Sequence, residues 1–190
     1  MPKKKVKETP AQTELEFSYE LKIPKERVAV LIGKKGETKK QLEDSTNSKI
    51  EIDSNEGDVF ITGKDALSLF ACREVIRAIA RGFNPDVAQL LLRQDYGFEL
   101  IDIVDYAKTK NDELRLKGRV IGESGKSRRL IEDFTETNIC VYGKTIGIVG
   151  QLEQIPMARR AISALLAGSM HAKVYKMLER EARKLRMQKR

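Results

Sequence analysis

One short motif occurs twice in this chain of 190 residues, at a spacing that the surrounding sequence shares. Gly33-Lys34-Lys35-Gly36 matches Gly122-Glu123-Ser124-Gly125 at an offset of 89 positions, and the same offset pairs Ile50 with Ile139. After a loop that is two residues shorter, an offset of 87 continues the match. Because about 70 residues repeat, the sequence predicts two consecutive domains of the same kind.

Hydrophobic periodicity predicts the same order of elements in both copies, namely strand, helix, helix, strand, strand and helix. Phe17, Tyr19, Leu21 and Ile23 alternate with polar residues, which is typical of a strand with one buried face. The elements expected in the first copy are 15–23, 27–32, 37–46, 49–53, 59–62 and 65–80. Those expected in the second copy are 98–104, 112–121, 128–135, 139–142, 145–149 and 154–167. The fold class is therefore α+β.

The segment between the copies predicts a helix rather than a loose linker. Asn84-Pro85-Asp86 combines a capping residue, a proline at the first helical position and an acid in the first turn. Apolar residues follow at 87–92 and are expected to pack between the domains. We expect a basic N-terminal tail at 1–12, a first domain at 13–82, an interdomain helix at 83–94, a second domain at 95–170 and a basic helical extension of the last helix at 171–190.

The net charge of +8 lies at the two ends of the chain. Residues 1–10 carry +3 and residues 171–190 carry +6, which leaves −1 for the body between them. Basic ends attract the phosphates of nucleic acids and release their counterions, without reading the sequence of bases. A solvated tail that only aids solubility is the alternative interpretation.

Several classes of protein are disfavoured by composition. No run of about 18 apolar residues exists and the basic N-terminus has no apolar stretch behind it, so we expect a cytoplasmic protein with no membrane partner. Cys72 and Cys140 lie far apart and His171 is the only histidine, which disfavours a metal site and a disulfide scaffold. We expect no metal and no cofactor.

No group of residues with catalytic spacing emerges, so we predict that the protein is not an enzyme. Gly125-Lys126-Ser127 resembles the end of a phosphate-binding P-loop, but Val120 stands where the full motif needs a glycine. The carboxylate pairs Glu43-Asp44 and Glu132-Asp133 recur with the repeat itself, which favours a role in the fold or in solvation.

A Gly-x-x-Gly loop between two short helices, followed by two strands and a long helix, resembles the KH domain. The element order is similar to the type I KH arrangement (βααββα), which implies a three-stranded antiparallel sheet packed by helices in each copy. In KH domains this loop clamps the backbone of about four single-stranded nucleotides. Glycines allow the close approach of a phosphate, and the N-terminus of the next helix offers free N–H groups.

The resemblance implies a set of RNA-binding residues in each copy. In the first copy they are Gly33, Lys34, Lys35 and Gly36. In the second copy they are Arg119, Gly122, Glu123, Ser124, Gly125, Lys126, Arg128 and Arg129. The expected apolar floor of the grooves, with its supporting core, is Val30, Ile32, Ile50, Ile52, Val120, Ile121 and Ile139. Glu123 departs from the usual pattern because it places a carboxylate where a base often sits.

The junction of the two copies resembles one family of tandem KH proteins in particular. Ala80-Arg81-Gly82-Phe83-Asn84-Pro85, Leu90-Leu91-Leu92 and the segment from Tyr96 to Tyr106 are similar to the partner-of-Nob family of small-subunit ribosome-assembly factors, in its archaeal form. The resemblance implies binding of single-stranded RNA near the 3′ end of 16S rRNA during rRNA processing, alongside assembly proteins such as the Nob endonuclease. A KH subunit of an RNA-degradation or translation complex, and a protein-docking scaffold with little RNA affinity, are the alternatives.

Overall fold

Both copies have the expected order of elements. The computed structural model describes residues 17–188, so the basic tail expected at 1–12 lies outside the described residues. The first copy consists of β1 (Phe17–Lys22), α1 (Lys25–Ile32), α2 (Glu37–Thr46), β2 (Ser48–Ile52), β3 (Asp58–Gly63) and α3 (Ala66–Ala80). The second consists of β4 (Tyr96–Asp102), α5 (Lys110–Ile121), α6 (Lys126–Thr135), β5 (Asn138–Tyr142), β6 (Thr145–Gln151) and α7 (Ile155–Leu166).

Each copy forms one three-stranded antiparallel sheet, as the resemblance to type I KH domains implies. The strand orders are β1-β3-β2 and β4-β6-β5, so the last strand of each copy lies in the centre of its sheet. Ile50 pairs with Ile61 in the first sheet and Ile139 pairs with Ile148 in the second, and all four side chains are buried. The alternation of side chains along these strands therefore turns one face of each sheet toward its own helices.

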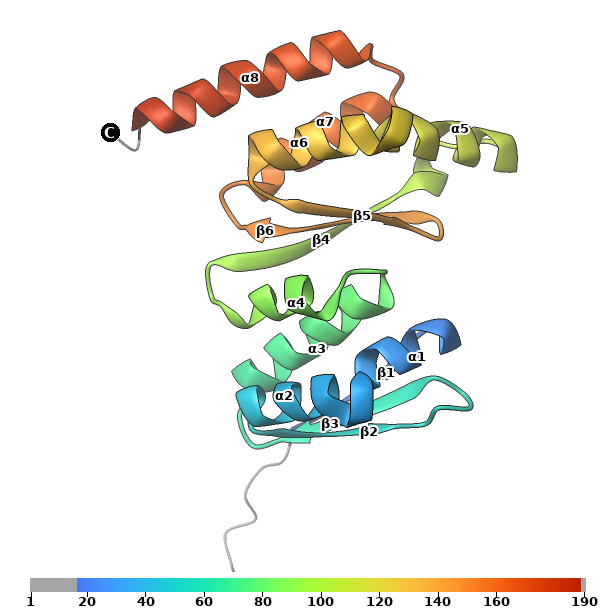
Figure 1. Cartoon of the computed structure of the whole chain (residues 1–190), viewed down its shortest axis with the longest axis vertical. Coiled ribbons are helices and arrows are strands. Elements are labelled where there is room, and N and C mark those ends of the chain that lie inside the picture. The colour runs from blue at the N-terminus through green and yellow to red at the C-terminus, as the bar shows by residue number, and fades with distance from the viewer. Residues whose placement is uncertain (1–16, 189–190) are drawn as a thin grey trace, which may run out of the picture.

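The two domains are stacked so that sheets and helices alternate along the long axis of the molecule (Figure 1). The first sheet lies at one end, and α1, α2 and α3 cover its inner face (Figure 1). The second sheet lies on the other side of α3 and carries α5, α6 and α7 on its far face (Figure 1). The second sheet is thus covered on both faces, and Val149 in its central strand is completely buried within the first core.

The segment between the copies packs against both domains. It contains α4 (Pro85–Ala88) and a 3₁₀ turn, Gln89–Leu92; the side chain of Asn84, the N-cap residue before α4, accepts the Asp86 N–H. Ala88 and Leu91 are buried, and Phe83 meets Phe98 edge to face with their ring centroids 6.0 Å apart. These contacts hold the two domains in one arrangement.

The expectation that the C-terminal segment extends the last helix is wrong. Helix α7 ends at Leu166, and a separate helix, α8 (His171–Gln188), packs on α6 and α7 (Figure 1). Gly168 adopts a φ of +95°, and the Gly168 and Ser169 N–H groups donate to Leu165 and Ala164. This Schellman motif terminates α7, because only glycine adopts such a φ without strain. Val174 and Leu178 are buried in the second core, so we propose that α8 be counted with the second domain.

An arginine joins the first and third helices of each copy. Arg27 donates from Nε to the Ile79 carbonyl and from a terminal nitrogen to the Phe83 carbonyl, at 2.8 and 2.7 Å. Arg119 donates in the same way to Leu165 and Ser169, at 3.1 and 2.6 Å. The Ile79 and Leu165 carbonyls also accept the N–H groups of Gly82 and Gly168, so each arginine adds a charged donor where α3 or α7 ends and ties down the residue that follows the glycine. Within residues 17–188, no helix is long and apolar enough to span a membrane.

Candidate functional site

The two Gly-x-x-Gly loops have the same backbone conformation. Gly33 has φ and ψ of 74° and −179°, and Gly122 has 72° and 176°. The third loop residue lies in the left-handed region in both copies although it is not glycine, with φ of 54° at Lys35 and 49° at Ser124. Such conformations cost energy in residues that carry a side chain and tend to occur at functional sites. The repetition of this geometry marks the two loops as candidate sites.

Steric contact explains why the first loop position must be glycine. A Cβ atom on Gly33 would lie 2.9 Å from the backbone nitrogen of Thr38, and one on Gly122 would lie 2.7 Å from that of Ser127. The second glycine is different: a Cβ atom on Gly36 would meet nothing within 4 Å. The first glycine is thus needed for the close packing of the loop on the next helix, and the second only for its positive φ.

Each loop leads directly into the N-terminus of a helix that no side chain caps. Gly36 precedes α2 and Gly125 precedes α6, and neither N-cap makes a side-chain hydrogen bond with a described residue. The first N–H groups of a helix have no partner within it and carry a partial positive charge. The Glu37 and Lys126 N–H groups donate to the Lys34 and Glu123 carbonyls, so the donors that each helix start can offer an anion such as a phosphate are the N–H groups that follow.

The first loop carries two exposed lysines. Lys34 and Lys35 project from the loop, and neither forms an ion pair with a residue in the described range 17–188. The nearest acid in the sequence is Glu37, the first residue of α2, whose carboxylate accepts a hydrogen bond from Gln41. The loop thus combines uncapped N–H groups with two cations that are available to a ligand.

The second loop distributes its charges differently. Glu123 and Lys126 are both exposed, and Arg129 donates from Nε to the Gly125 carbonyl at 3.4 Å and from a terminal nitrogen to the Ser124 carbonyl. Arg128 is half-buried and pairs with Glu132 at 3.6 Å. Lys126 and Arg129 are consequently the exposed basic residues next to this loop.

Arg119 does not point its charge at the loop, although its place in the sequence suggests a contact there. Its guanidinium binds the end of α7, while its own carbonyl lies 2.8 Å from Nε2 of His171 in α8. A hollow of about 490 Å³ separates the Gly122 loop from the start of α8, with Tyr175 on its far wall. The hydroxyl of Ser127, which also lines it, is buried and has no hydrogen-bond partner among the described residues.

The apolar residues expected in the grooves divide by exposure. Ile50, Val120 and Ile139 are buried in the cores. The half-buried members, whose side chains a ligand can reach, are Val30, Ile32, Ile52 and Ile121. Val141 is also half-buried and was missed, although the offset of 89 pairs it with Ile52. Alignment of the two copies could have found it.

The recurring carboxylates Glu43 and Glu132 have a structural role, as their repetition suggests. Glu43 accepts the Ile50 N–H and Glu132 accepts the Ile139 N–H, both at 2.7 Å. Each bond ties the second helix of its copy to the next strand. Burial raises the pKa of Glu132, and the Ile139 N–H only partly offsets that effect.

Neither cysteine, nor any acidic cluster in the part of the chain that the structure describes, suggests a reactive or metal-binding centre. Burial raises the pKa of the thiols of Cys72 and Cys140, which keeps them protonated and unreactive. Within residues 17–188, no group of three or more histidine, cysteine, aspartate or glutamate side chains could hold a metal ion. The loops thus remain the candidate site, with chemistry suited to binding an anion.

Two models of protein families match the two copies. Residues 97–183 match a eukaryotic-type KH domain (KH-domain type I), in a model named for the second KH domain of PNO1. Residues 18–78 match the KH domain. The match to the second copy runs into α8, in agreement with the packing of that helix on the second core.

Similar proteins are known from archaea and eukaryotes. A KH domain-containing protein of Methanocaldococcus jannaschii is 52% identical over 170 residues, which cover 87% of this chain and 74% of that protein. The RNA-binding protein PNO1 of Oryzias latipes is 39% identical over 114 residues, which cover 59% of this chain. The match spans only 47% of that eukaryotic protein.

Solved structures share the whole arrangement. Dim2p from Pyrococcus horikoshii is 43% identical with a TM-score of 0.81, and the match covers 86% of this chain and 99% of that one. The same archaeal protein in a complex with a/eIF2alpha and rRNA is 41% identical, with a TM-score of 0.85 and coverage of 90% and 97%. The fold of both copies is therefore shared across nearly the full length of these archaeal chains.

Proposed function

Because this chain belongs to the KH-domain family of PNO1 and archaeal Dim2p ribosome-assembly factors, we propose that it binds rRNA during assembly of the small ribosomal subunit. The finer proposal is that it binds single-stranded RNA near the 3′ end of 16S rRNA through the two Gly-x-x-Gly loops. The protein then acts as a binding factor that positions RNA, and catalysis belongs to its partners.

The observation that carries this proposal is the pair of loops with one backbone conformation, each opening onto an uncapped helix N-terminus. Phosphate contacts at such loops set the register of an RNA strand, and contacts to base edges in the adjacent groove give preference for sequence. Val30 and Ile32 of α1 come just before the first loop, and Ile52 lies in β2; all three are half-buried aliphatic side chains of the kind that suit the faces of unstacked bases.

The fixed arrangement of the domains supports joint binding by both loops. Once one loop holds an RNA, the other meets the same strand at a high effective concentration, provided that the separation of the loops does not change. The contact between Phe83 and Phe98 and the burial of Val149 maintain that separation.

Protein partners follow from the family rather than from any surface described above. The complex with a/eIF2alpha and rRNA belongs to the Pyrococcus protein, and we propose that this chain has ribosome-assembly partners of a comparable kind, the Nob endonuclease among them. We retain the expectation of a cytoplasmic site of action. A scaffold that binds only proteins is the competing function, and it predicts no affinity for single-stranded RNA.

Fluorescence anisotropy with a short single-stranded RNA from the 3′ end of a small-subunit rRNA tests the proposal. We would compare the intact chain with Lys34→Asp/Lys35→Asp and with Lys126→Asp/Arg129→Asp, and would use an RNA duplex as a competitor. Lys108→Asp/Lys110→Asp is the matched control, because both lysines are exposed at the far end of α5 from the second loop.

We expect each loop variant to lose at least tenfold in affinity, on the order of the salt-dependent contribution of two phosphate contacts, while the control stays near the intact chain. The larger loss identifies the dominant loop. Equal binding of duplex and single strand by all variants would refute the role of the loops and favour the scaffold.

A further inference from the structure

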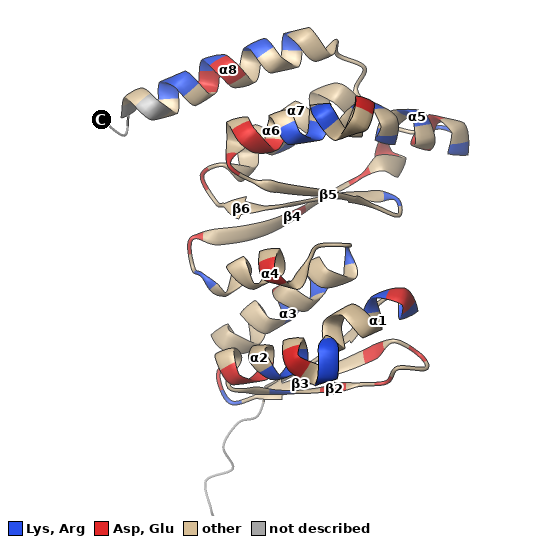
Figure 2. Ribbon diagram, in the orientation of Figure 1, with Lys and Arg blue, Asp and Glu red and all other residues tan. Residues whose placement is uncertain are grey.

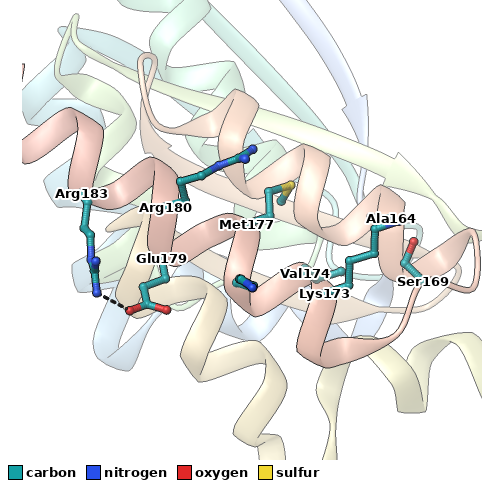
Figure 3. Close-up of a pocket in the computed structure, with 9 residues that line it drawn as sticks. Ala164, Ser169, Lys173, Val174, Met177, Glu179, Arg180 and Arg183 are labelled. Carbon is teal, nitrogen blue, oxygen red and sulfur yellow. Dashed lines mark hydrogen bonds and ion pairs between the residues drawn. The ribbon is translucent and has the colours of Figure 1, made fainter.

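Helix α8 presents two different flanks. His171 and Tyr175 lie beside the second Gly-x-x-Gly loop. Lys173 and Arg180 point to nearly the opposite side, because successive residues of a helix are rotated by about 100°. This opposite flank borders a groove of about 610 Å³ between α7 and α8 (Figure 3).

Three of the four cations that line this groove have no acidic partner among the described residues. Lys173, Lys176 and Arg180 are exposed and form no ion pair within residues 17–188. The acids of α8 are already engaged: Glu179 pairs with Arg183 at 2.8 Å, and Glu181 pairs with Arg160 of α7. Blue segments accordingly recur along α8 in Figure 2. The groove therefore has an uncompensated positive charge.

Between these cations, the groove has an apolar floor. Ala164 of α7, with Val174 and Met177 of α8, lines it, and Figure 3 shows the Met177 side chain between Arg180 and Lys173. The small side chain of Ala164 leaves room above α7. An apolar floor with a methionine thioether suits contact with an aromatic ring, and a nucleobase is such a ring.

We propose that the α7/α8 groove is a third RNA-binding site, which holds a phosphodiester with its base and lies outside both Gly-x-x-Gly loops. The cations bind the phosphate oxygens, and the Ala164–Met177 floor receives the base. This inference rests on the proposed RNA binding of the chain. The cations suit RNA and an acidic peptide alike, but the apolar floor favours RNA because it adds a surface for a planar ring.

The groove and the second loop belong to one rigid unit, so a single RNA strand can contact both. The Nε2 atom of His171 lies 2.8 Å from the Arg119 carbonyl, and Val174 and Leu178 anchor α8 in the core. An RNA of about six nucleotides fills one loop, which holds about four. A strand of about 20 nucleotides is long enough to continue from the loop across α8.

The test compares Lys173→Gln/Arg180→Gln with the control Lys108→Gln/Lys110→Gln, which removes the same charge at the start of α5. Affinity for both RNAs is measured between roughly 0.05 and 0.3 M salt. For the long RNA, we expect the groove variant to lose about tenfold in affinity, and the slope of log affinity against log salt to flatten by about 1.4. For the short RNA, groove variant and control are expected to bind equally well.

Ala164→Phe provides a second variant that fills the floor without changing charge, with thermal unfolding to verify its fold. It is expected to weaken binding of the long RNA only. If the groove variant matches the Lys108/Lys110 control on the long RNA, the third site is refuted, while loss of binding in the loop variants still supports the proposed function. If neither loop nor groove variants reduce binding, both proposals fail.

Discussion

At the scale of single residues, the two glycines of each loop are required for different physical reasons. Gly33 occupies a region of φ and ψ that is almost exclusive to glycine, and its backbone also lies against Thr38. Gly36 has a positive φ in open space. The two glycines of the motif thus meet two separate requirements: the first allows close packing on the next helix, and the second allows a left-handed turn.

Substitution of the two glycines by alanine should therefore have unequal costs. Gly36→Ala introduces only the strain of a left-handed backbone conformation, which lowers the free energy of unfolding by about 1 kcal/mol. Gly33→Ala adds a collision with the Thr38 backbone, so we expect a total of about 3 kcal/mol. Urea denaturation of the two variants measures the difference. Equal losses would contradict the steric explanation.

The half-buried carboxylate of Glu132 predicts a pH dependence of stability. Its pKa is raised in the folded state, so the folded protein binds this proton more tightly than the unfolded chain does. The contribution of Glu132 to stability therefore falls as the pH rises from the ordinary value of 4.5 through the raised value. Glu132→Gln keeps an oxygen that can accept the Ile139 N–H, but its side chain does not titrate.

We expect the stability of Glu132→Gln relative to the natural chain to increase between about pH 4 and pH 7. Urea midpoints at the two pH values measure this change. Asp133→Asn, at the exposed neighbouring position, controls for the loss of one negative charge. A constant difference across the range would show that burial of Glu132 has no energetic effect.

At the scale of elements, the arginines that join the first and third helices show what sequence alignment of the copies cannot find. Arg27 lies six residues before Gly33, whereas Arg119 lies three residues before Gly122. The two positions are one helical turn apart on the same face, so they perform one task without matching in the repeat. Their equivalence is seen only in the three-dimensional structure, where both guanidinium groups bind the C-terminal end of the third helix.

Removal of either arginine should destabilise the protein, because it leaves two helix-terminal carbonyls without a charged donor. We expect Arg27→Ala to cost about 2 kcal/mol in the free energy of unfolding, and Arg27→Lys more than half of that, since an ammonium cannot bridge both carbonyls in the same geometry. Arg81→Ala, at an exposed neighbouring site, should stay within about 0.5 kcal/mol. Similar losses for Arg27→Ala and Arg81→Ala would refute the role of the bridge.

What the sequence predicts here are the local elements, and what it does not predict are contacts between residues far apart in the chain. Periodicity and the repeat predict every strand and all the helices of the two KH copies, because alternation and helical spacing are local properties. The break at Gly168 was missed because one glycine in a helical pattern has several interpretations. The same glycine motif ends α3 at Gly82, and this recurrence was the available signal. The direction of Arg119 depends on contacts across 46 residues, which no local pattern contains.

At the scale of the whole molecule, the stacking of the second sheet on the helices of the first domain makes two domains one body. Arg77 lies 5.7 Å from the centre of the Phe98 ring, and Tyr142 donates its hydroxyl proton to Glu26 across the same junction. Gly82 lies so close to Cys140 that a Cβ atom would be 2.8 Å from the sulfur. Binding of one strand by both loops depends on the rigidity of this junction.

The junction should make the two domains unfold together. Phe83 is only 4% exposed, and its truncation in Phe83→Ala removes the ring that fills the space between α3 and the second sheet, at a cost of about 3–4 kcal/mol. A tryptophan introduced by Phe60→Trp, at an exposed position, provides a fluorescent probe of the first domain. In this Phe60→Trp chain, circular dichroism and tryptophan fluorescence should therefore report one urea midpoint. In the Phe83→Ala variant of that chain, the two probes should give separate midpoints, because each domain then unfolds by itself.

A second truncation separates loss of the junction from loss of any large side chain. Leu69→Ala removes a fully buried side chain from within the first core, at a comparable cost in the free energy of unfolding. It should lower both midpoints while they remain coincident, since the coupling between domains is intact. If Phe83→Ala also keeps a single midpoint, the coupling does not depend on this ring. If the midpoints separate and the affinity for a long RNA falls while that for a short RNA does not, the junction fixes the distance between the two loops.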